Sequence, residues 1–136
     1  LEMVKYLELI AMEPIFYNWK SHVSKTKSDE LHIRLIKMEI DPNEIANFNN
    51  LARTVMLPGI RKESGVLVMY AVAEKNQPTH ISILEVYANL TAYEKHLKTP
   101  HFRRYQEESA KMVRSLKLME VMPIFLGSKP QKNSER

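Results

Sequence analysis

The side chains best suited to acid–base chemistry, Tyr87, His96 and His101, lie close together in the sequence. Thr99-Pro100 predicts the start of a helix with Thr99 as its N-cap, which places His101 in the first turn. The positive end of the helix dipole disfavours a charged imidazole there, and this suits the ring to accepting a proton. We therefore predict His101 as a catalytic base, with simple packing at the helix start as the alternative role.

Other polar and aromatic side chains could complete a site around this base. A tyrosine hydroxyl can hydrogen-bond a phenolic or quinol oxygen, although buried tyrosines also simply fill cores. An arginine on a strand could pair with an anionic substrate, or remain solvated at a strand edge. The predicted catalytic residues are His101, Tyr70 and Tyr87, and the predicted substrate-binding residues are His32, Arg34, His96 and Phe102.

Composition excludes several kinds of site. The 136 residues include no cysteine, so disulfides, thiolate metal ligands and a cysteine nucleophile are excluded. They include only three glycines and no glycine-rich phosphate loop, which argues against a dinucleotide cofactor. His96 and His101 lie on either side of a helix break, and no acidic residue joins them at metal-ligand spacing. We therefore expect neither a metal nor a cofactor.

The charge pattern and the apolar segments limit the partners of the chain. The net charge of +4 is spread along the sequence without a basic stripe interleaved with aromatic residues, so no nucleic-acid partner is expected. No stretch reaches the apolar length of a membrane span, and the first residues lack the layout of a signal peptide. We expect no membrane partner and a cytoplasmic location.

The elements that must position the candidate side chains follow a simple order. Apolar alternation predicts strands over residues 32–40, 65–73, 79–87 and 116–125. One helix is predicted after Asp41 and ends at Pro58-Gly59, and a broken helix is predicted over residues 91–114 with Thr91 as its N-cap. The order β-α-β-β-α-β is that of a ferredoxin-like α+β domain, with both helices on one face of the sheet. Both faces of the strands carry aliphatic residues, so we expect a second sheet to cover the face without helices.

The sequence also repeats itself near its two ends. Residues 3–16, MVKYLELIAMEPIF, match residues 112–125, MVRSLKLMEVMPIF, at seven of 14 positions with a constant offset of 109. This spacing is about one domain. It predicts that residues 1–19 are the helix-and-strand remnant of a preceding copy, residues 20–30 a linker, residues 31–126 one domain and residues 127–136 a disordered tail. The alternative is an N-terminal strand that pairs with the sheet of this domain.

The stretch ILEVYANLTAYEKHLKTPHFRRY resembles the strand-and-helix signature of the antibiotic biosynthesis monooxygenase family. The likeness extends back to HIRLIKMEIDPNEIANF and forward to LKLMEVMPIF, and HLKTPHF is its most specific part. The resemblance implies a dimeric α+β barrel, formed by a homodimer or with a tandem-repeat partner domain. It also implies that a small aromatic substrate binds between the helices and the sheet.

The same resemblance narrows the chemistry. The family includes cofactor-independent monooxygenases that oxidise quinols or aromatic polyketides with dioxygen, which implies a quinol-like or polycyclic aromatic substrate that first loses a phenolic proton. The alternative is a non-catalytic binding or structural copy that completes a barrel with a tandem partner. Haem degradation is disfavoured because the chain departs from the residues typical of the family and of its haem-degrading members at Tyr87, His96, Gln106 and Ile36.

Overall fold

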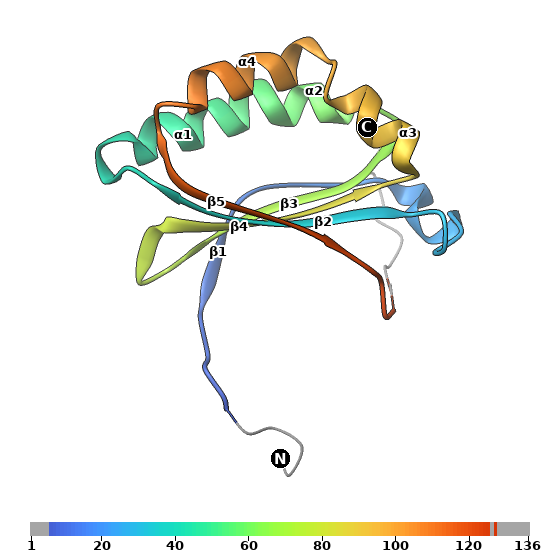
Figure 1. The fold of residues 1–136 in the computed structure, drawn as a ribbon, viewed down its shortest axis with the longest axis horizontal. Helices are drawn as coiled ribbons and strands as arrows, with labels where there is room; N and C mark the ends of the chain where they lie inside the picture. Colours follow the sequence, from blue (N-terminus) through green and yellow to red (C-terminus); the bar gives the residue numbers. More distant parts are fainter. Residues whose placement is uncertain (1–5, 126, 128–136) are drawn as a thin grey trace.

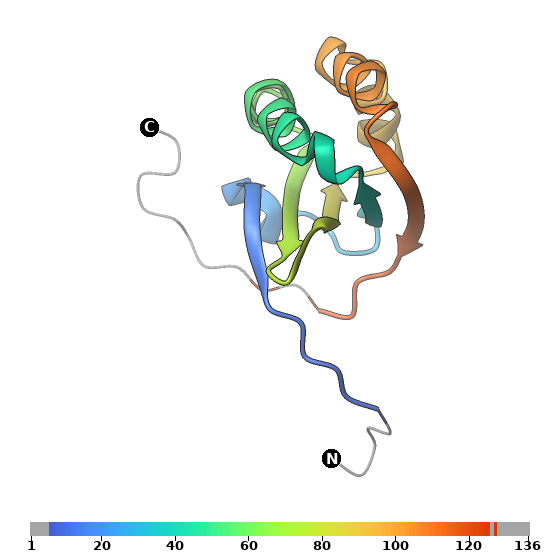
Figure 2. The same ribbon diagram turned by 90° about the vertical axis from the view of Figure 1, so that its left-hand side faces the viewer.

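The structure, a computed structural model, describes residues 6–125 and 127 of the chain. Within this part, five antiparallel strands form one sheet, and the helices α1 to α4 lie together over one of its faces (Figures 1 and 2). The strands are β1 Met12–Trp19, β2 His32–Ile40, β3 Val66–Glu74, β4 Gln77–Tyr87 and β5 Val113–Val121. The helices are α1 Ile45–Leu51, α2 Leu57–Arg61, α3 Leu90–His96 and α4 Pro100–Ser109, with a π-helical segment Ala52–Met56 between α1 and α2 and short 3-10 turns at Ser21–Lys25 and Pro42–Glu44. None of the helices described is long and apolar enough to cross a membrane.

The strand order β1-β3-β4-β2-β5 confirms the predicted ferredoxin-like α+β fold. Strands β2 to β5, with the two helical segments between them, form the expected β-α-β-β-α-β unit. β1 is an additional strand at the edge of the sheet, where it pairs antiparallel with β3 so that Phe16 lies opposite Ala71. Its Ile15 and Phe16 side chains are each only 6% exposed, so β1 is packed into this domain.

The first helical region is longer than the sequence predicts. The predicted end at Pro58-Gly59 is wrong, because α2 continues through both residues to Arg61. Pro58 lies near the start of α2, directly after the wider π-helical turn, where the hydrogen-bond ladder is already shifted. A proline without its own N–H is tolerated at such a position. Ile60, beyond the proline, is fully buried and joins the core beneath the helices.

The second helical region is broken as the sequence predicts. Thr99 Oγ1 accepts a hydrogen bond from the backbone N–H of Phe102 at 3.3 Å, which confirms Thr99 as the N-cap of α4. The predicted N-cap of α3, Thr91, is wrong. Asn89 takes this role, with Oδ1 accepting from the N–H of Ala92 at 2.8 Å.

The face of the sheet without helices is partly covered by the chain itself. The 3-10 turn Ser21–Lys25, in the stretch expected to be a linker, lays Val23 on this face. The buried members of the resulting cluster are Val23, Ile33, Leu67, Val68 and Val86. Beside it, Tyr17 and Tyr70 stack with ring centroids 5.6 Å apart and remain 52% and 37% exposed. A second sheet is thus not required over the whole face, and a dimeric or tandem barrel remains a prediction.

Candidate functional site

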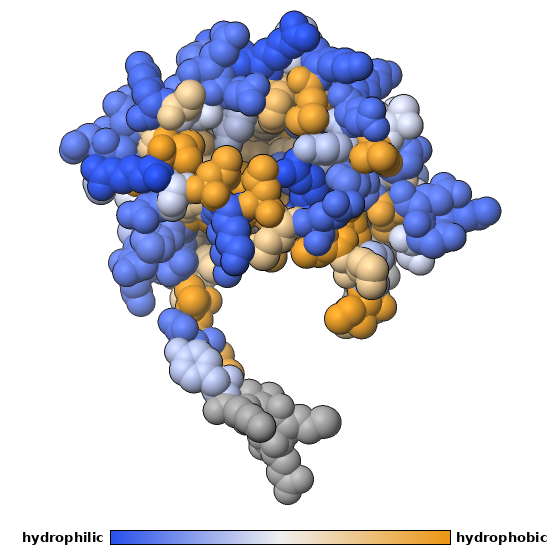
Figure 3. Space-filling model, viewed as in Figure 1, coloured by the Kyte–Doolittle hydropathy of each residue, from blue (hydrophilic) through white to orange (hydrophobic). Residues whose placement is uncertain are grey.

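A cavity of about 620 Å³ lies between the helices and the sheet. Most of its wall is apolar, and its volume falls within the range of small-molecule sites, about 300–1,000 Å³. Its opening lies along β5, where Leu116 and Leu118 line it and are 54% and 51% exposed. In the space-filling view, hydrophobic side chains border a hollow between the helices and β5 (Figure 3). A flat apolar molecule could enter from this side.

A few polar side chains from β2, β4 and α3 project into this apolar space. Glu85 is only 8% exposed and lines the cavity together with Arg34, Tyr87 and Tyr93. Arg34 and Glu85 are direct neighbours across β2 and β4. Arg34 also donates a hydrogen bond to the hydroxyl of Tyr93 and lies over its ring. The cavity therefore contains a buried carboxyl group, a guanidinium group and two phenols.

The surroundings of Glu85 change its proton affinity. Burial raises the pKa of Glu85, and the hydrogen bond from Tyr87 and the positive charge of Arg34 offset only part of this effect. Burial also raises the pKa of Tyr87 far above its ordinary value, so Tyr87 acts as a hydrogen-bond donor. A carboxylate with a raised pKa is a stronger proton acceptor than an exposed one, so Glu85 is a candidate general base.

Glu85 is not among the predicted site residues, although the sequence contains a signal for it. It occupies the same alternating positions of β4 as Ile81, Ile83 and Tyr87, which all face the helices. A charged residue in an otherwise apolar row is a recognisable sign of a functional position. Glu85 interrupts the apolar side chains on the helix-facing side of β4, and this interruption is the signal that points to it.

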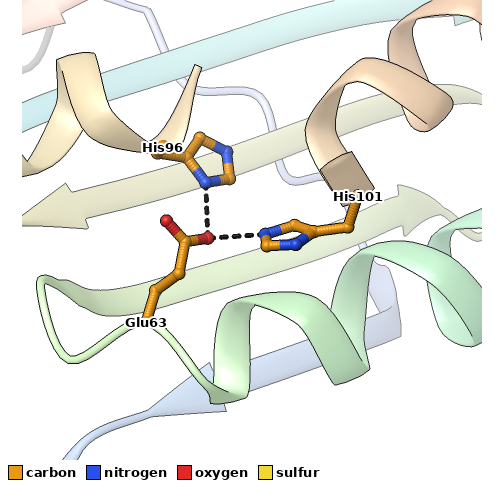
Figure 4. A group of neighbouring side chains, drawn as sticks. All are labelled: Glu63, His96 and His101. Carbon is orange, nitrogen blue, oxygen red and sulfur yellow. Dashed lines mark hydrogen bonds and ion pairs between the residues drawn. The ribbon is translucent and has the colours of Figure 1, made fainter. Parts of the chain in front are cut away.

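His96 and His101 belong to a separate cluster outside the cavity (Figure 4). Oε2 of Glu63, in the loop between α2 and β3, lies 2.8 Å from Nδ1 of His96 and 2.6 Å from Nε2 of His101. Burial alone would raise the pKa of Glu63, but the hydrogen bonds and charges of the two histidines outweigh it and lower that pKa. The expectation that no acidic residue joins these histidines is wrong, because the fold supplies one from a distant segment.

The position of His101 depends on a glycine. A Cβ atom at Gly59 would lie 2.2 Å from Cγ of His101. The imidazole therefore fills the space that a side chain at position 59 would occupy. The ring thus turns toward α2 and Glu63. Neither His101 nor His96 is among the residues that line the cavity. The rings of Tyr87 and Phe102 lie next to His96, with centroids 5.5 and 5.1 Å away, and form that part of the wall.

Of the remaining predicted residues, all but Tyr70 lie on the helix-covered side of the sheet. Arg34, Tyr87 and Phe102 line the cavity. His32 is not among the lining residues, and its ring centroid lies 4.7 Å from that of Tyr93. The placement of Tyr70 near this pocket is wrong: its neighbours in β3, Met69 and Ala71, line the cavity, so strand alternation turns Tyr70 to the opposite face.

Comparisons with known proteins show the family and fold of the chain. Residues 31–108 match the model of the family described as antibiotic biosynthesis monooxygenase. A crystal structure from Bacteroides thetaiotaomicron, provisionally named an antibiotic biosynthesis monooxygenase, is 39% identical with a TM-score of 0.72 and covers 77% of this chain and 100% of that one. No curated protein matches the chain.

Two similar structures belong to longer chains. A provisionally named monooxygenase from Lactobacillus acidophilus is 28% identical with a TM-score of 0.73, and the match covers 84% of this chain and 51% of that one. For a protein from Fusobacterium nucleatum, the identity is 17%, the TM-score 0.70 and the coverage 83% and 49%, which shows a shared fold alone. This chain therefore spans about half the length of both proteins.

Proposed function

Because the chain belongs to the antibiotic biosynthesis monooxygenase family, we propose that it oxidises a small quinol-like or polycyclic aromatic molecule with dioxygen. The observation that carries this proposal is the buried carboxyl group of Glu85, which lines an apolar cavity of about 620 Å³ opposite Arg34. The apolar wall suits an aromatic ring, and the polar groups suit its phenolic oxygen.

The proposed reaction begins with transfer of the phenolic proton to Glu85. The guanidinium group of Arg34 stabilises the resulting phenolate, whose electron-rich ring passes electrons to dioxygen. One oxygen atom replaces a ring hydrogen and becomes a quinone carbonyl. The other oxygen leaves as water with the ring hydrogen and the phenolic proton. The substrate supplies all the electrons that dioxygen accepts, so the reaction consumes no external reductant.

In this proposal the predicted residues take different roles. Glu85 replaces His101 as the base, and Tyr87 holds the carboxyl group of Glu85 through its hydroxyl. Arg34 and Phe102 contact the substrate, since both line the cavity. The burial of Glu85 supports this assignment, because removing a carboxylate from water strengthens it as a proton acceptor.

Oxygen uptake with a panel of hydroquinones, naphthols and anthrols tests the proposal. We expect at least one substrate to give one quinone and one water per dioxygen, with one oxygen atom from labelled dioxygen in the quinone. Oxygen uptake no faster than in buffer across the panel would contradict the proposal. Ligand binding without uptake would favour a binding domain.

One observation favours the alternative of a copy that completes a barrel with a partner. Ile15 and Phe16 are buried against the sheet, whereas their repeat counterparts Ile124 and Phe125 are 97% and 89% exposed. We propose that residues 1–19 come from a preceding copy, and that residues 122–125 pair with the equivalent edge of that copy. The double length of the Lactobacillus protein supports this arrangement.

The coding sequence upstream of residue 1 tests the tandem arrangement. We expect a second segment similar to EVY and HLKTPHF about one domain earlier. An upstream sequence without such a segment would leave a homodimer as the remaining way to form a barrel. Light scattering on this chain measures that association directly.

A further inference from the structure

The side chains of Glu63, His96 and His101 converge from three separate segments (Figure 4). They belong to the loop before β3, the last turn of α3 and the first turn of α4. One carboxylate oxygen and one nitrogen of each ring lie within 4.8 Å of one another. We propose that these three residues bind a divalent transition-metal ion of the Zn²⁺ class.

The donor atoms suit such an ion. Two imidazole nitrogens and one carboxylate oxygen form a common protein ligand set for zinc and related ions, with bonds of about 2.0–2.2 Å. A tetrahedral ion with such bonds holds its donors about 3.3 Å apart. The separations of 2.8 and 2.6 Å between Glu63 Oε2 and the two ring nitrogens must therefore open slightly. Small rotations of the Glu63 and His101 side chains provide this movement.

The surroundings hold the donors in place and leave room for a further ligand. His96 is 1% exposed, whereas the side chains of Glu63 and His101 are 13% and 18% exposed, so water can reach a fourth coordination position. Gly59 provides the space into which the His101 ring fits. The positive charge of Lys20 disfavours a bound cation nearby. Its ammonium group, however, donates hydrogen bonds to three backbone carbonyl oxygens at 2.7–3.0 Å, which hold it in place.

In the ion-free form, one nitrogen of each ring lies within hydrogen-bond distance of the same oxygen of Glu63. A neutral imidazole that binds an ion through this nitrogen carries its proton on the other ring nitrogen, so binding selects that tautomer of each ring and preserves the arrangement of the three side chains. The ion ties the loop after α2 to the break between α3 and α4. Tyr93 and Phe102, on either side of that break, form part of the cavity wall, so the ion stiffens this wall. This inference does not rest on the proposed oxidation.

Titration of the untagged, chelator-treated chain with Co²⁺ and Zn²⁺ tests the site. We expect calorimetry to give one Zn²⁺ per chain, and bound Co²⁺ to give visible absorption bands that Zn²⁺ removes. Paramagnetic Co²⁺ should broaden the NMR signals of the His96 and His101 rings before those of the other histidines. This measurement needs no variant and so does not depend on a substitution being tolerated.

Glu63→Gln and His101→Gln should each weaken binding at least tenfold. His80→Gln is the matched control, because His80 Nδ1 lies 3.8 Å from a carboxylate oxygen of Glu74 in another histidine–glutamate pair. Its affinity should equal that of the unmodified chain. The absence of saturable binding at micromolar ion concentrations would overturn the proposal, as would equal binding in folded Glu63→Gln and His101→Gln. Because binding is read without substrate, its failure is separate from failure of the oxidation.

Discussion

The hydroxyl of Tyr87 donates a hydrogen bond to Oε1 of Glu85 at 2.9 Å, two residues earlier on the same strand. Alternation along β4 places both side chains on the face under the helices, where Tyr87 is fully buried and Glu85 nearly so. The pair joins a proton acceptor to a donor that hardly ionises. Burial raises the pKa of Glu85, and this contact offsets part of that rise, so both affect the proton affinity on which the proposed reaction depends.

Replacing Tyr87 by phenylalanine should move the pH profile of oxidation. The hydrogen bond from Tyr87 lowers the pKa of Glu85 against the effect of burial, so its loss raises that pKa further. The base then ionises at higher pH, and the rise of kcat/KM with pH shifts upward. Tyr70→Phe is the matched control, since Tyr70 lies on the other face, and should leave the profile in place. Equal pH profiles for both variants would contradict the claim that Tyr87 affects the pKa of the catalytic base.

The burial of Glu85 should also cost stability as pH rises. Because the folded-state pKa is raised above the ordinary value of 4.5, folding favours the protonated form. The contribution of the protonated Glu85 carboxyl group to stability is fully present below the unfolded-state pKa. It is lost as the pH rises through the folded-state pKa. Glu85→Gln should therefore gain stability relative to the unmodified chain as pH rises over that interval. Urea unfolding at several pH values measures the difference, and a gap that is constant with pH would contradict the assigned burial effect.

Gly59→Ala should displace the ring of His101. The new methyl group overlaps the ring, and overpacking of this kind costs about 1–3 kcal/mol. The same displacement breaks the hydrogen bond from His101 to Glu63, so the pKa of Glu63 should rise toward its ordinary value. Chemical denaturation and carboxyl NMR titration measure the two effects. A variant with unchanged stability and an unchanged Glu63 titration would show that α2 and the ring are not in close contact.

The repeated motif allows a comparison between two copies of one residue. Phe16→Ala should destabilise this chain by about 3–5 kcal/mol, because the ring is buried under the helices. Phe125→Ala should change stability by less than about 0.5 kcal/mol, because its ring is exposed. Urea denaturation of the two variants tests this directly. A large loss of stability in Phe125→Ala would contradict this expectation, because it would mean that the ring of Phe125 is already packed against other residues.

The sequence predicts the fold well because its signals are local. Strand periodicity and the cap at Thr99 depend on neighbouring residues, and the structure agrees with them except at the last strand, where β5 spans Val113–Val121 in place of the predicted 116–125. The face of each strand is harder to assign, and this is why the predicted position of Tyr70 on the helix-covered face is wrong. The effect of Pro58 depends on the π-helical turn before it, which has no clear signature in the sequence.

The site could be predicted only in part, because it depends on contacts between distant segments. Arg34, Tyr87 and Phe102 do line the cavity. Glu63 meets His96 and His101 only once three segments have packed together, so no spacing in the sequence reveals it. The cavity forms only when the helices pack on the sheet. His101 does not line it, because the ring of His101 lies in the space that Gly59 leaves beside α2.

The most direct measurement is oxygen uptake by Glu85→Gln with the best quinol-like substrate of the panel. The variant keeps the shape of the side chain but removes the proton acceptor, so kcat/KM should fall about 100-fold or more, while Tyr70→Phe keeps the original rate. Circular dichroism and substrate binding should show that the folded cavity is retained. A folded Glu85→Gln variant with unchanged uptake would contradict the proposal that this buried carboxylate begins the oxidation.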